Sequence, residues 1–305
     1  MTDHTTAELL QRYSDITFYP AADDDCGWIS AVLARFCPPG GRVLDPFCGS
    51  AVMSLVAALD GYEVFASDAN PLTEVFVQMF KGRADYFKNI EITADALGRD
   101  DAQSIIGSIC RSDMFGCDAA SIHALLYCAS RLLADGACIP AAAAHYQAMY
   151  RSVRARTASF VAGLEPHAHA LERRLAYRTG DIARIDSGMG AHLCFFDPPY
   201  FNGCSFARSS APLIALLGHR ADPADDRALL ADEAAYQRAL TGWLKTCCDA
   251  LDDAGVLVFA VSPGQREQRR QLLDAAHRLG LPLDEAVYGN QPYLYSVKAA
   301  AGKAP

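Results

Sequence analysis

The feature that most constrains the fold is a short apolar segment that runs directly into a turn containing glycine and then into a helical segment. Arg42-Val-Leu44 predicts a buried strand, Asp45-Pro-Phe-Cys-Gly-Ser50 the turn, and residues 51–59 the helix. A second buried strand is predicted at Tyr62–Ala66, before Ser67-Asp68-Ala69-Asn70-Pro71. Strands that alternate with helices indicate a parallel α/β sheet.

The same alternation returns in the second half of the chain. His192–Phe196 is an apolar strand that runs into Asp197-Pro-Pro-Tyr200, and the sheet pattern resumes before it where Tyr177 leads into Thr179-Gly180-Asp181-Ile182. The stretch from Phe201 to Asp232 carries charges and prolines and is expected to be loop-like. The remaining expected elements are helices at Trp28–Phe36, Ala234–Leu251 and Gln265–Leu279, a strand at Gly255–Val261, and two strands near Glu285–Val297.

Between these two halves lies a helical, alanine-rich segment at 72–175, too long for a single crossover helix. We therefore expect a helical insertion that serves as a target-recognition subdomain, within a catalytic domain formed by 1–71 and 176–305. The end of the insertion is locally basic, and Arg151, Arg154 and Arg156 are candidates for contact with a substrate backbone. A solvated helix face is the alternative interpretation of these arginines.

Composition limits the class of protein. The chain has 305 residues and a net charge of −9, which argues against indiscriminate coating of nucleic acid, although a local basic groove is compatible with it. No apolar run is long enough for a membrane span, and the first residues carry no signal sequence, so a cytoplasmic location without membrane contact is expected. Eleven cysteines without a C-x-x-C pair, and histidines without ligand spacing, predict no metal site.

The first turn has the residue types of a ligand site. Small residues allow a ligand to approach the backbone, the following helix begins with free N–H groups, and such sites lie past the carboxyl ends of strands. The carboxylate of Asp68, at the end of the next strand, could accept hydrogen bonds from ribose hydroxyls. A tight strand-to-helix connection without a ligand is the other interpretation.

The second turn, Asp197-Pro-Pro-Tyr200, presents acceptors beside an aromatic ring. The two prolines remove two backbone donors and fix the chain, so the Asp197 carboxylate and the Pro198 carbonyl remain as acceptors. Acceptors next to the ring of Tyr200 suit a planar heterocycle with an exocyclic NH₂ group. An ordinary turn is the alternative, and it is less favoured because the first turn lies in the same predicted sheet.

Together these residues resemble those of the amino-group methyltransferases that use S-adenosylmethionine, which include the N6-adenine and N4-cytosine DNA methylases and their RNA relatives. The matches are D-P-F-C-G-S at 45–50, S-D-A-N-P at 67–71, T-G-D at 179–181 and F-D-P-P-Y at 196–200. The resemblance implies an α/β fold, a Rossmann-like class I methyltransferase sheet with helices on both faces, here with a mostly helical insertion. The order of the motifs is similar to that of bacterial GATC-methylating adenine enzymes.

The resemblance also implies roles for individual residues. It assigns the catalytic role to Asp197, Pro198, Pro199 and Tyr200, and stacking of the target base to Tyr200 and Phe201. Asp at position 197 favours adenine over cytosine. One departure is Ala51, which stands where the family has a second glycine. The residues that it implies for cofactor binding are Asp45, Phe47, Cys48, Gly49, Ser50, Asp68, Ala69, Asp181 and Ile182.

Three functions follow as alternatives. The first is adenine-N6 methylation of a specific DNA site, with the target base flipped out of the duplex and with a restriction enzyme as a conceivable partner. The second is the same chemistry on RNA or on a small heteroaromatic amine, which the acidic charge favours. The third is a catalytically silent binding subunit with this fold, which the intact D-P-P-Y argues against. No covalent intermediate is needed, so Cys48 and Cys194 are expected to be packing residues.

Overall fold

The computed structural model describes residues 4–17, 26–135, 142–180, 182–199, 201, 206–218, 232–259, 266–288 and 291–297. Two of the predicted site residues, Asp181 and Tyr200, lie outside these ranges.

Seven strands form a single mixed sheet in the order β3-β2-β1-β4-β5-β7-β6. The first five strands in this order run parallel, and β7 runs antiparallel to both β5 and β6. This arrangement, with a reversed strand inserted before the last one, is that of class I methyltransferases, so the predicted fold class is confirmed. The strands are β1 Arg42–Asp45, β2 Glu63–Asp68, β3 Leu175–Thr179, β4 Ala191–Phe196, β5 Leu251–Phe259, β6 Asp284–Tyr288 and β7 Gln291–Val297.

The strand order reverses between β1 and β4. These two central strands pair in parallel, with Val43 opposite Leu193 and Leu44 opposite Cys194. β1 ends at Asp45 and β4 at Phe196, so the two motifs that follow leave the same edge of the sheet. Ligands of open α/β sheets bind at such a reversal point.

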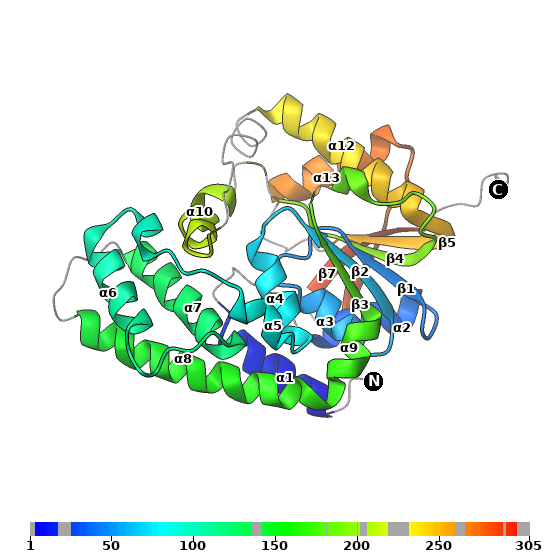
Figure 1. Cartoon of the computed structure of the whole chain (residues 1–305). Coiled ribbons are helices and arrows are strands. Elements are labelled where there is room, and N and C mark those ends of the chain that lie inside the picture. The colour runs from blue at the N-terminus through cyan, green and yellow to red at the C-terminus, as the bar shows by residue number, and fades with distance from the viewer. Residues whose placement is uncertain are drawn as a thin grey trace.

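Helices cover both faces of the sheet, as Figure 1 shows. One face packs against α2 Cys26–Phe36, α3 Val52–Leu59 and α9 Ala168–Arg174, and the other against α12 Glu233–Ala250 and α13 Arg266–Arg278. The strands alternate accordingly: Val43 belongs to the core on the α3 side, whereas Leu44 belongs to the core on the α12 side. This alternation is what a strand buried on both faces requires.

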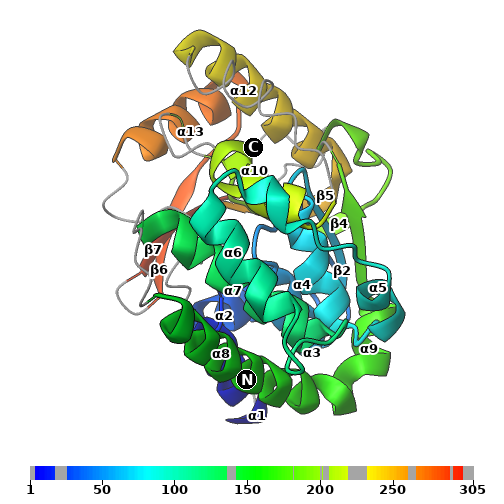
Figure 2. The same ribbon diagram turned by 60° about the vertical axis from the view of Figure 1, so that its left-hand side comes forward.

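The segment between β2 and β3 is helical, as predicted. Its main helices α6, α7 and α8 stand together beside the sheet in both ribbon views (Figures 1 and 2). The first strand after it begins at Leu175, which the predicted boundary had placed in the insertion. The helices of this segment before α9 are α4 Leu72–Phe80, α5 Ala84–Lys88, α6 Asp100–Cys110, α7 Ala119–Asp135 and α8 Ala142–Leu164, with 3-10 turns η1 Ala94–Leu97 and η2 Glu165–His167.

These helices share one hydrophobic core with the sheet rather than forming a core of their own. An N-terminal helix, α1 His4–Ser14, contributes to the junction through Tyr13. The Tyr13 ring lies 5.2 Å from that of Phe80 on α4 and 5.3 Å from that of Phe160 on α8. These buried rings join α1 to two helices of the insertion, and the same core includes residues of the sheet, so the insertion and the sheet are expected to unfold together.

Two expectations about local structure were wrong. Part of the segment expected to be loop-like forms α10, Phe206–Leu216, with Pro212 inside it. This helix buries Leu213, Ile214 and Leu216, and the burial outweighs the backbone hydrogen bond that proline lacks. β5 begins at Leu251, four residues before the predicted start, because the pairing of β5 with β4 includes the pair Leu251 and Ala191.

The connection from β3 to β4 is short. Its described part contains the 3-10 turn η3 Ile182–Arg184 and no longer helix. Among the described helices, none is long and apolar enough to cross a membrane.

The shared core predicts a single unfolding transition. Phe160→Ala removes a fully buried ring and should lower the free energy of unfolding by about 3–5 kcal/mol. Both tryptophans, Trp28 and Trp243, lie outside the insertion. Urea unfolding followed by their fluorescence and by far-UV circular dichroism should therefore give coincident midpoints, lowered equally in the variant.

Ser159→Ala, at an exposed position on the same helix, is the matched control and should change the free energy of unfolding by less than ~0.5 kcal/mol. A Phe160→Ala variant that shifts only the circular dichroism transition would show that the insertion folds independently.

Candidate functional site

The loop after β1 is held in an unusual backbone conformation. Gly49 has φ 50° and Ala51 has φ 59°, both in the left-handed region. Ala51 is fully buried, caps α3, and donates its N–H to the carbonyl of Cys48 at 2.5 Å. Left-handed backbone is costly for any residue with a Cβ, so alanine is accommodated here at a position that glycine would adopt more easily.

The carboxylate of Asp68 joins the loops that follow β1 and β2. One oxygen accepts the N–H of Gly49 at 2.8 Å, and the other accepts the N–H of Asn70 at 2.7 Å. Burial raises the pKa of Asp68 to about 6, although these two N–H groups act in the opposite direction. Each carboxylate oxygen has a second acceptor position, so two further donors can be accommodated.

Two side chains from neighbouring helices hold the carbonyl groups of the β1 loop. The hydroxyl of Tyr13 on α1 donates to the carbonyl of Ser50 at 2.8 Å, and the hydroxyl of Thr73 on α4 donates to that of Gly49 at 2.8 Å. The backbone of this loop is therefore fixed from several sides before any ligand binds. Such preorganisation reduces the free energy lost on binding.

Two predicted cofactor residues of this loop face the interior. Asp45 is 1% exposed and accepts a hydrogen bond from Ser54 at 2.6 Å. Cys48 is buried, and burial raises the pKa of its thiol well above the ordinary value. A protonated, buried thiol is a poor nucleophile, which agrees with the expected packing role of Cys48. Cys194 is fully buried as well.

A hollow of about 230 Å³ lies on the α12 side of the sheet, beside the ends of β2 and β3. Its lining includes apolar Leu44 and Phe65, Ser67 and Gly180 at the strand ends, and the charged residues Arg184 and Asp186 in the connection to β4. The side chain of Ile182, a predicted cofactor residue, is 3% exposed and belongs to the core. The predicted cofactor residue Ala69 is exposed beside Asp68.

The turn after β4 is anchored by α12. Pro198 is buried and Asp197 is half-buried. The hydroxyl of Tyr236 donates to the carbonyl of Pro199 at 2.7 Å. Burial raises the pKa of Tyr236 to about 12, with a smaller contribution from the charge of Asp197, so this hydroxyl keeps its proton at neutral pH.

A row of aromatic rings connects the two motif loops. The Phe201 ring, after the second motif, lies 5.4 Å from that of Tyr236. Tyr236 in turn lies 6.4 Å from Trp243, and Trp243 lies 5.3 Å from Phe47 in the first motif. Phe47 also packs against Phe196 at the end of β4, at 5.5 Å. The structure thus places the two sequence motifs next to each other.

The predicted arginines on α8 are not brought to these loops by any contact within the described chain. Arg154 bonds to Ser121 at 2.9 Å and pairs with Asp118 at 3.4 Å, both at the start of α7. Arg156 donates to the carbonyl of Asp15 at 2.9 Å, and Arg151 is exposed. Their contact with a substrate backbone stays a prediction.

Three residues that organise the site were not identified from the sequence: Tyr13, Tyr236 and Trp243. Each acts through tertiary contacts, and both tyrosines lie 37 residues from the carbonyl that they hold. The only sequence signal was the position of Tyr236 and Trp243 on an amphipathic helical segment, which is equally typical of core residues.

A second, open groove of about 490 Å³ lies between α12 and α13. Arginines and carboxylates both line it, and Arg270 is already paired with Glu233, Glu267 and Asp274. These opposite charges offset one another, so this groove is a poorer candidate for a ligand site than the strand ends.

The left-handed conformation of Ala51 can be tested by two alanine-to-glycine substitutions in one segment. Ala58→Gly, inside α3, should lower the free energy of unfolding by about 1.5–2 kcal/mol, from helix propensity and the lost buried methyl. Ala51→Gly loses a methyl too but releases about 1–2 kcal/mol of backbone strain, so its net effect should be near zero. Urea unfolding measures both, and equal losses would contradict the left-handed assignment.

No family model and no curated protein matches this chain. Similar solved structures include a TehB-like SAM-dependent methyltransferase from Corynebacterium glutamicum, with 13% identity, a TM-score of 0.40 and coverage of 96% of each chain. A methyltransferase from Pyrococcus furiosus has 13% identity and a TM-score of 0.41, with 93% of this chain and 89% of that chain covered.

A precorrin-6y C5,15-methyltransferase from Geobacter metallireducens has 8% identity and a TM-score of 0.37, with coverage of 89% and 87%. With TM-scores below 0.5, these similarities add nothing to the assignment, which rests on the strand order of the sheet. By that order the chain has the fold of the class I S-adenosylmethionine-dependent methyltransferases.

Proposed function

We propose that this protein transfers a methyl group from S-adenosylmethionine to an aromatic exocyclic amine, with the N6 amine of adenine in DNA as the acceptor. The observation that carries the proposal is the parallel pairing of β1 with β4, which brings the Gly49 loop and the Asp197-Pro-Pro turn to one edge of the sheet. One loop has the features of a cofactor site and the other those of an amine site.

The polar groups beside the first loop suit the cofactor. The carboxylate of Asp68 is half-buried, stands at the end of β2, and has acceptor positions left for a ribose diol. The hollow beside Ser67 and Gly180 is lined in part by Leu44 and Phe65, apolar side chains of the kind that suit a planar base. Gly49 allows close approach to the backbone of the loop.

The second loop fits an amine. Pro198 and Pro199 have no N–H, so the turn offers the Asp197 carboxylate and the Pro198 carbonyl as acceptors. An NH₂ group on an aromatic ring is a poor nucleophile, because its lone pair is delocalised into the ring. Two hydrogen bonds from this group to Asp197 and Pro198 would favour a tetrahedral nitrogen with a localised lone pair.

Catalysis on this account is positioning together with electrostatic stabilisation. When bound, S-adenosylmethionine supplies an electrophilic methyl group on a sulfonium. Asp197 stabilises the positive charge that develops on the amine nitrogen as the N–C bond forms and the C–S bond breaks, and the rigid turn fixes the direction of the lone pair. S-adenosylhomocysteine would be the leaving group, and the methylated nitrogen would lose its extra proton to solvent. The buried thiol of Cys48 takes no part.

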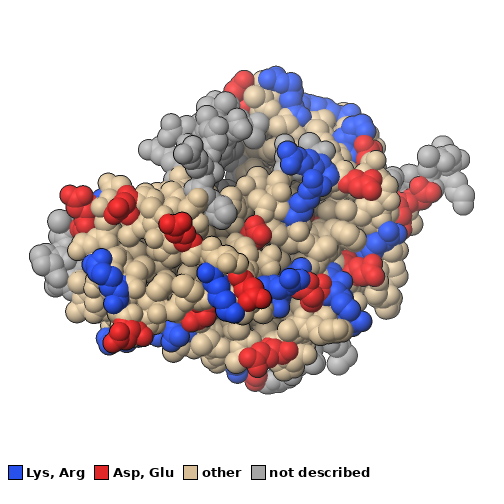
Figure 3. All heavy atoms as spheres, in the orientation of Figure 1, with Lys and Arg blue, Asp and Glu red and all other residues tan. Residues whose placement is uncertain are grey.

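A second acceptor class remains within the same chemistry: RNA or a small heteroaromatic amine. The net charge of −9 favours it. Arg154 and Arg156 are already engaged by protein groups, and Figure 3 shows cationic and anionic side chains interspersed on the face in view. DNA is proposed first because Asp197 and the order of the motifs resemble those of the adenine enzymes.

Transfer of tritium from labelled S-adenosylmethionine tests the function. The purified protein is incubated in parallel with unmethylated DNA, RNA and a mixture of nucleosides, and the methylated base is identified after digestion. Label in N6-methyladenine from DNA supports the first proposal, and label in RNA or nucleosides alone supports the second. No label in any acceptor would contradict both.

Asp197 should contribute to the chemical step and not to the binding of the cofactor. Asp197→Ala removes one of the two acceptors, and the lost interaction is strongest in the transition state, so kcat should fall by roughly 10²–10³. The affinity for S-adenosylmethionine, measured by calorimetry, should stay unchanged. Near-normal methyl transfer in single-turnover assays would show that the turn is only structural.

Binding of the cofactor should depend on the ionisation of Asp68. The pKa of this carboxyl is raised to about 6, and its ionised form is the better acceptor for a ribose diol, because protonation turns one oxygen into a donor. Affinity should therefore be nearly full at pH 7 and weaken below pH 6, by at most about tenfold per pH unit.

Asp68→Asn, which cannot titrate, is the matched control. It should bind more weakly at pH 7 and show no change between pH 5 and 7. Calorimetric titrations in which wild type is also independent of pH over this range would contradict the role of Asp68.

A further inference from the structure

One face of α12 carries two aromatic side chains that reach both motif loops. Tyr236 and Trp243 are seven residues apart, which places them on the same side of the helix, two turns from each other. Tyr236 is fully buried and Trp243 is half-buried. The distance between these two side chains along α12 therefore relates the positions of the two loops that they contact.

Tyr236 is the contact of α12 with the acceptor turn. Its hydroxyl donates to the carbonyl of Pro199 at 2.7 Å, and its ring packs against Phe201. The two prolines restrict the backbone of the turn, but neither Pro198 nor Pro199 has an N–H with which to donate a hydrogen bond. The hydrogen bond from Tyr236 therefore ties the Pro199 carbonyl to α12.

Trp243 is the contact of α12 with the cofactor loop. Its ring lies 5.3 Å from Phe47, at an interplanar angle of 64°. Phe47 lies two residues before Gly49 in the loop after β1. The contact with Trp243 therefore connects α12 to the cofactor loop. One rigid helix thus contacts the donor side and the acceptor side.

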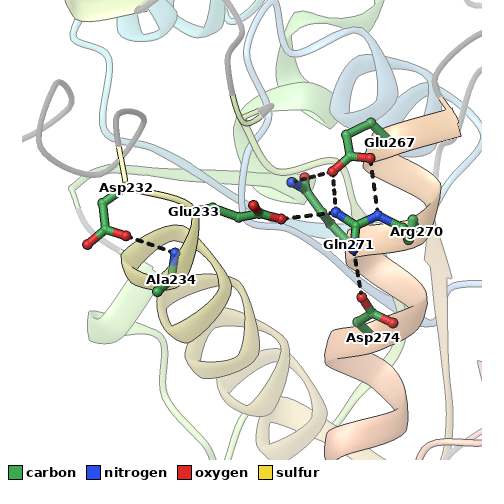
Figure 4. Close-up of polar contacts among 7 residues, drawn as sticks. All are labelled: Asp232, Glu233, Ala234, Glu267, Arg270, Gln271 and Asp274. Carbon is green, nitrogen blue, oxygen red and sulfur yellow. Dashed lines mark hydrogen bonds and ion pairs between the residues drawn. The ribbon is translucent and has the colours of Figure 1, made fainter.

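The first turn of α12 is itself fixed, as Figure 4 shows. Asp232 caps the helix by accepting the N–H of Ala234 at 2.9 Å. Glu233 pairs with Arg270 of α13 at 2.9 Å, and the same guanidinium also bonds to Glu267 and Asp274. Networks of several charges hold their geometry better than isolated surface pairs. Tyr236 follows only one turn later.

We propose that α12 sets the spacing between the cofactor loop and the acceptor turn, with Tyr236 as the positioning residue of the acceptor turn. The proposal rests on the proposed methyl transfer for its functional meaning. Attack on the methyl requires the reacting atoms to lie within about 3–3.5 Å, and a misplacement of about 1 Å costs about 10²-fold in rate. Fixing the spacing is therefore as important as supplying the acceptors.

Tyr236→Phe tests this inference, because it keeps the ring and removes only the hydroxyl. We expect kcat for methyl transfer to unmethylated DNA to fall by roughly 10–100-fold. The KM for S-adenosylmethionine should stay within about twofold, since the β1 loop keeps its own hydrogen bonds. A merely structural role would lower the Tm without this division between kcat and KM.

Tyr150→Phe is the matched control. Its hydroxyl also donates from a buried ring to a carbonyl, that of Met114 at 3.4 Å, but within the helical insertion. This variant should show the kcat of wild type. Equal kcat values for Tyr236→Phe, Tyr150→Phe and wild type would overturn the inference while leaving the methyl transfer itself intact.

Hydrogen exchange gives a readout that needs no activity. In Tyr236→Phe, the peptide that contains Phe201 should exchange faster than in wild type and in Tyr150→Phe. Faster exchange in a protein that methylates no acceptor would support the anchoring and contradict the proposed function. Unchanged exchange would overturn the anchoring whatever the activity.

Discussion

The parallel pairing of β1 with β4 is the constraint on which the rest of the site depends. These strands are separated by about half of the chain, and yet their carboxyl ends lie side by side at the reversal of strand order. Everything proposed for the chemistry follows from this adjacency, because the strand ends carry Asp45-Pro and Asp197-Pro respectively. The long helical segment between β2 and β3 does not disturb it, since its helices pack into the core that already covers one face of the sheet.

Around this edge, the backbone is held by side chains from separate elements. Asp68 ties the β1 loop to the β2 loop, Tyr13 holds the carbonyl of Ser50, and Tyr236 holds that of Pro199. The two tyrosines approach from opposite faces of the sheet, one on α1 and one on α12. A half-buried carboxylate and the hydroxyls of two buried tyrosines cost free energy unless they are hydrogen-bonded, so these contacts also favour one arrangement of the loops.

Much of the fold could be predicted from the sequence, because apolar strands and the turns after them are local signals. The strands at β1, β4 and the final pair, and the acidic residue at the end of β2, were predicted close to their observed places. α10 was missed because Pro212 is a strong local signal against helix, whereas the burial of Leu213 and Ile214 is decided by distant partners. Tyr13 and Tyr236 were missed for the same reason, since a hydrogen bond between distant residues leaves no periodic trace in the sequence.

A crystal structure with S-adenosylhomocysteine would test the central claim most directly. We expect the ribose hydroxyls to lie within hydrogen-bond distance of the Asp68 carboxylate. We also expect the sulfur of the ligand to face the turn formed by Asp197 and Pro198, and its adenine to lie in the hollow beside Ser67 and Gly180. Density for the ligand in the groove between α12 and α13, or no binding at saturating concentration, would contradict this claim.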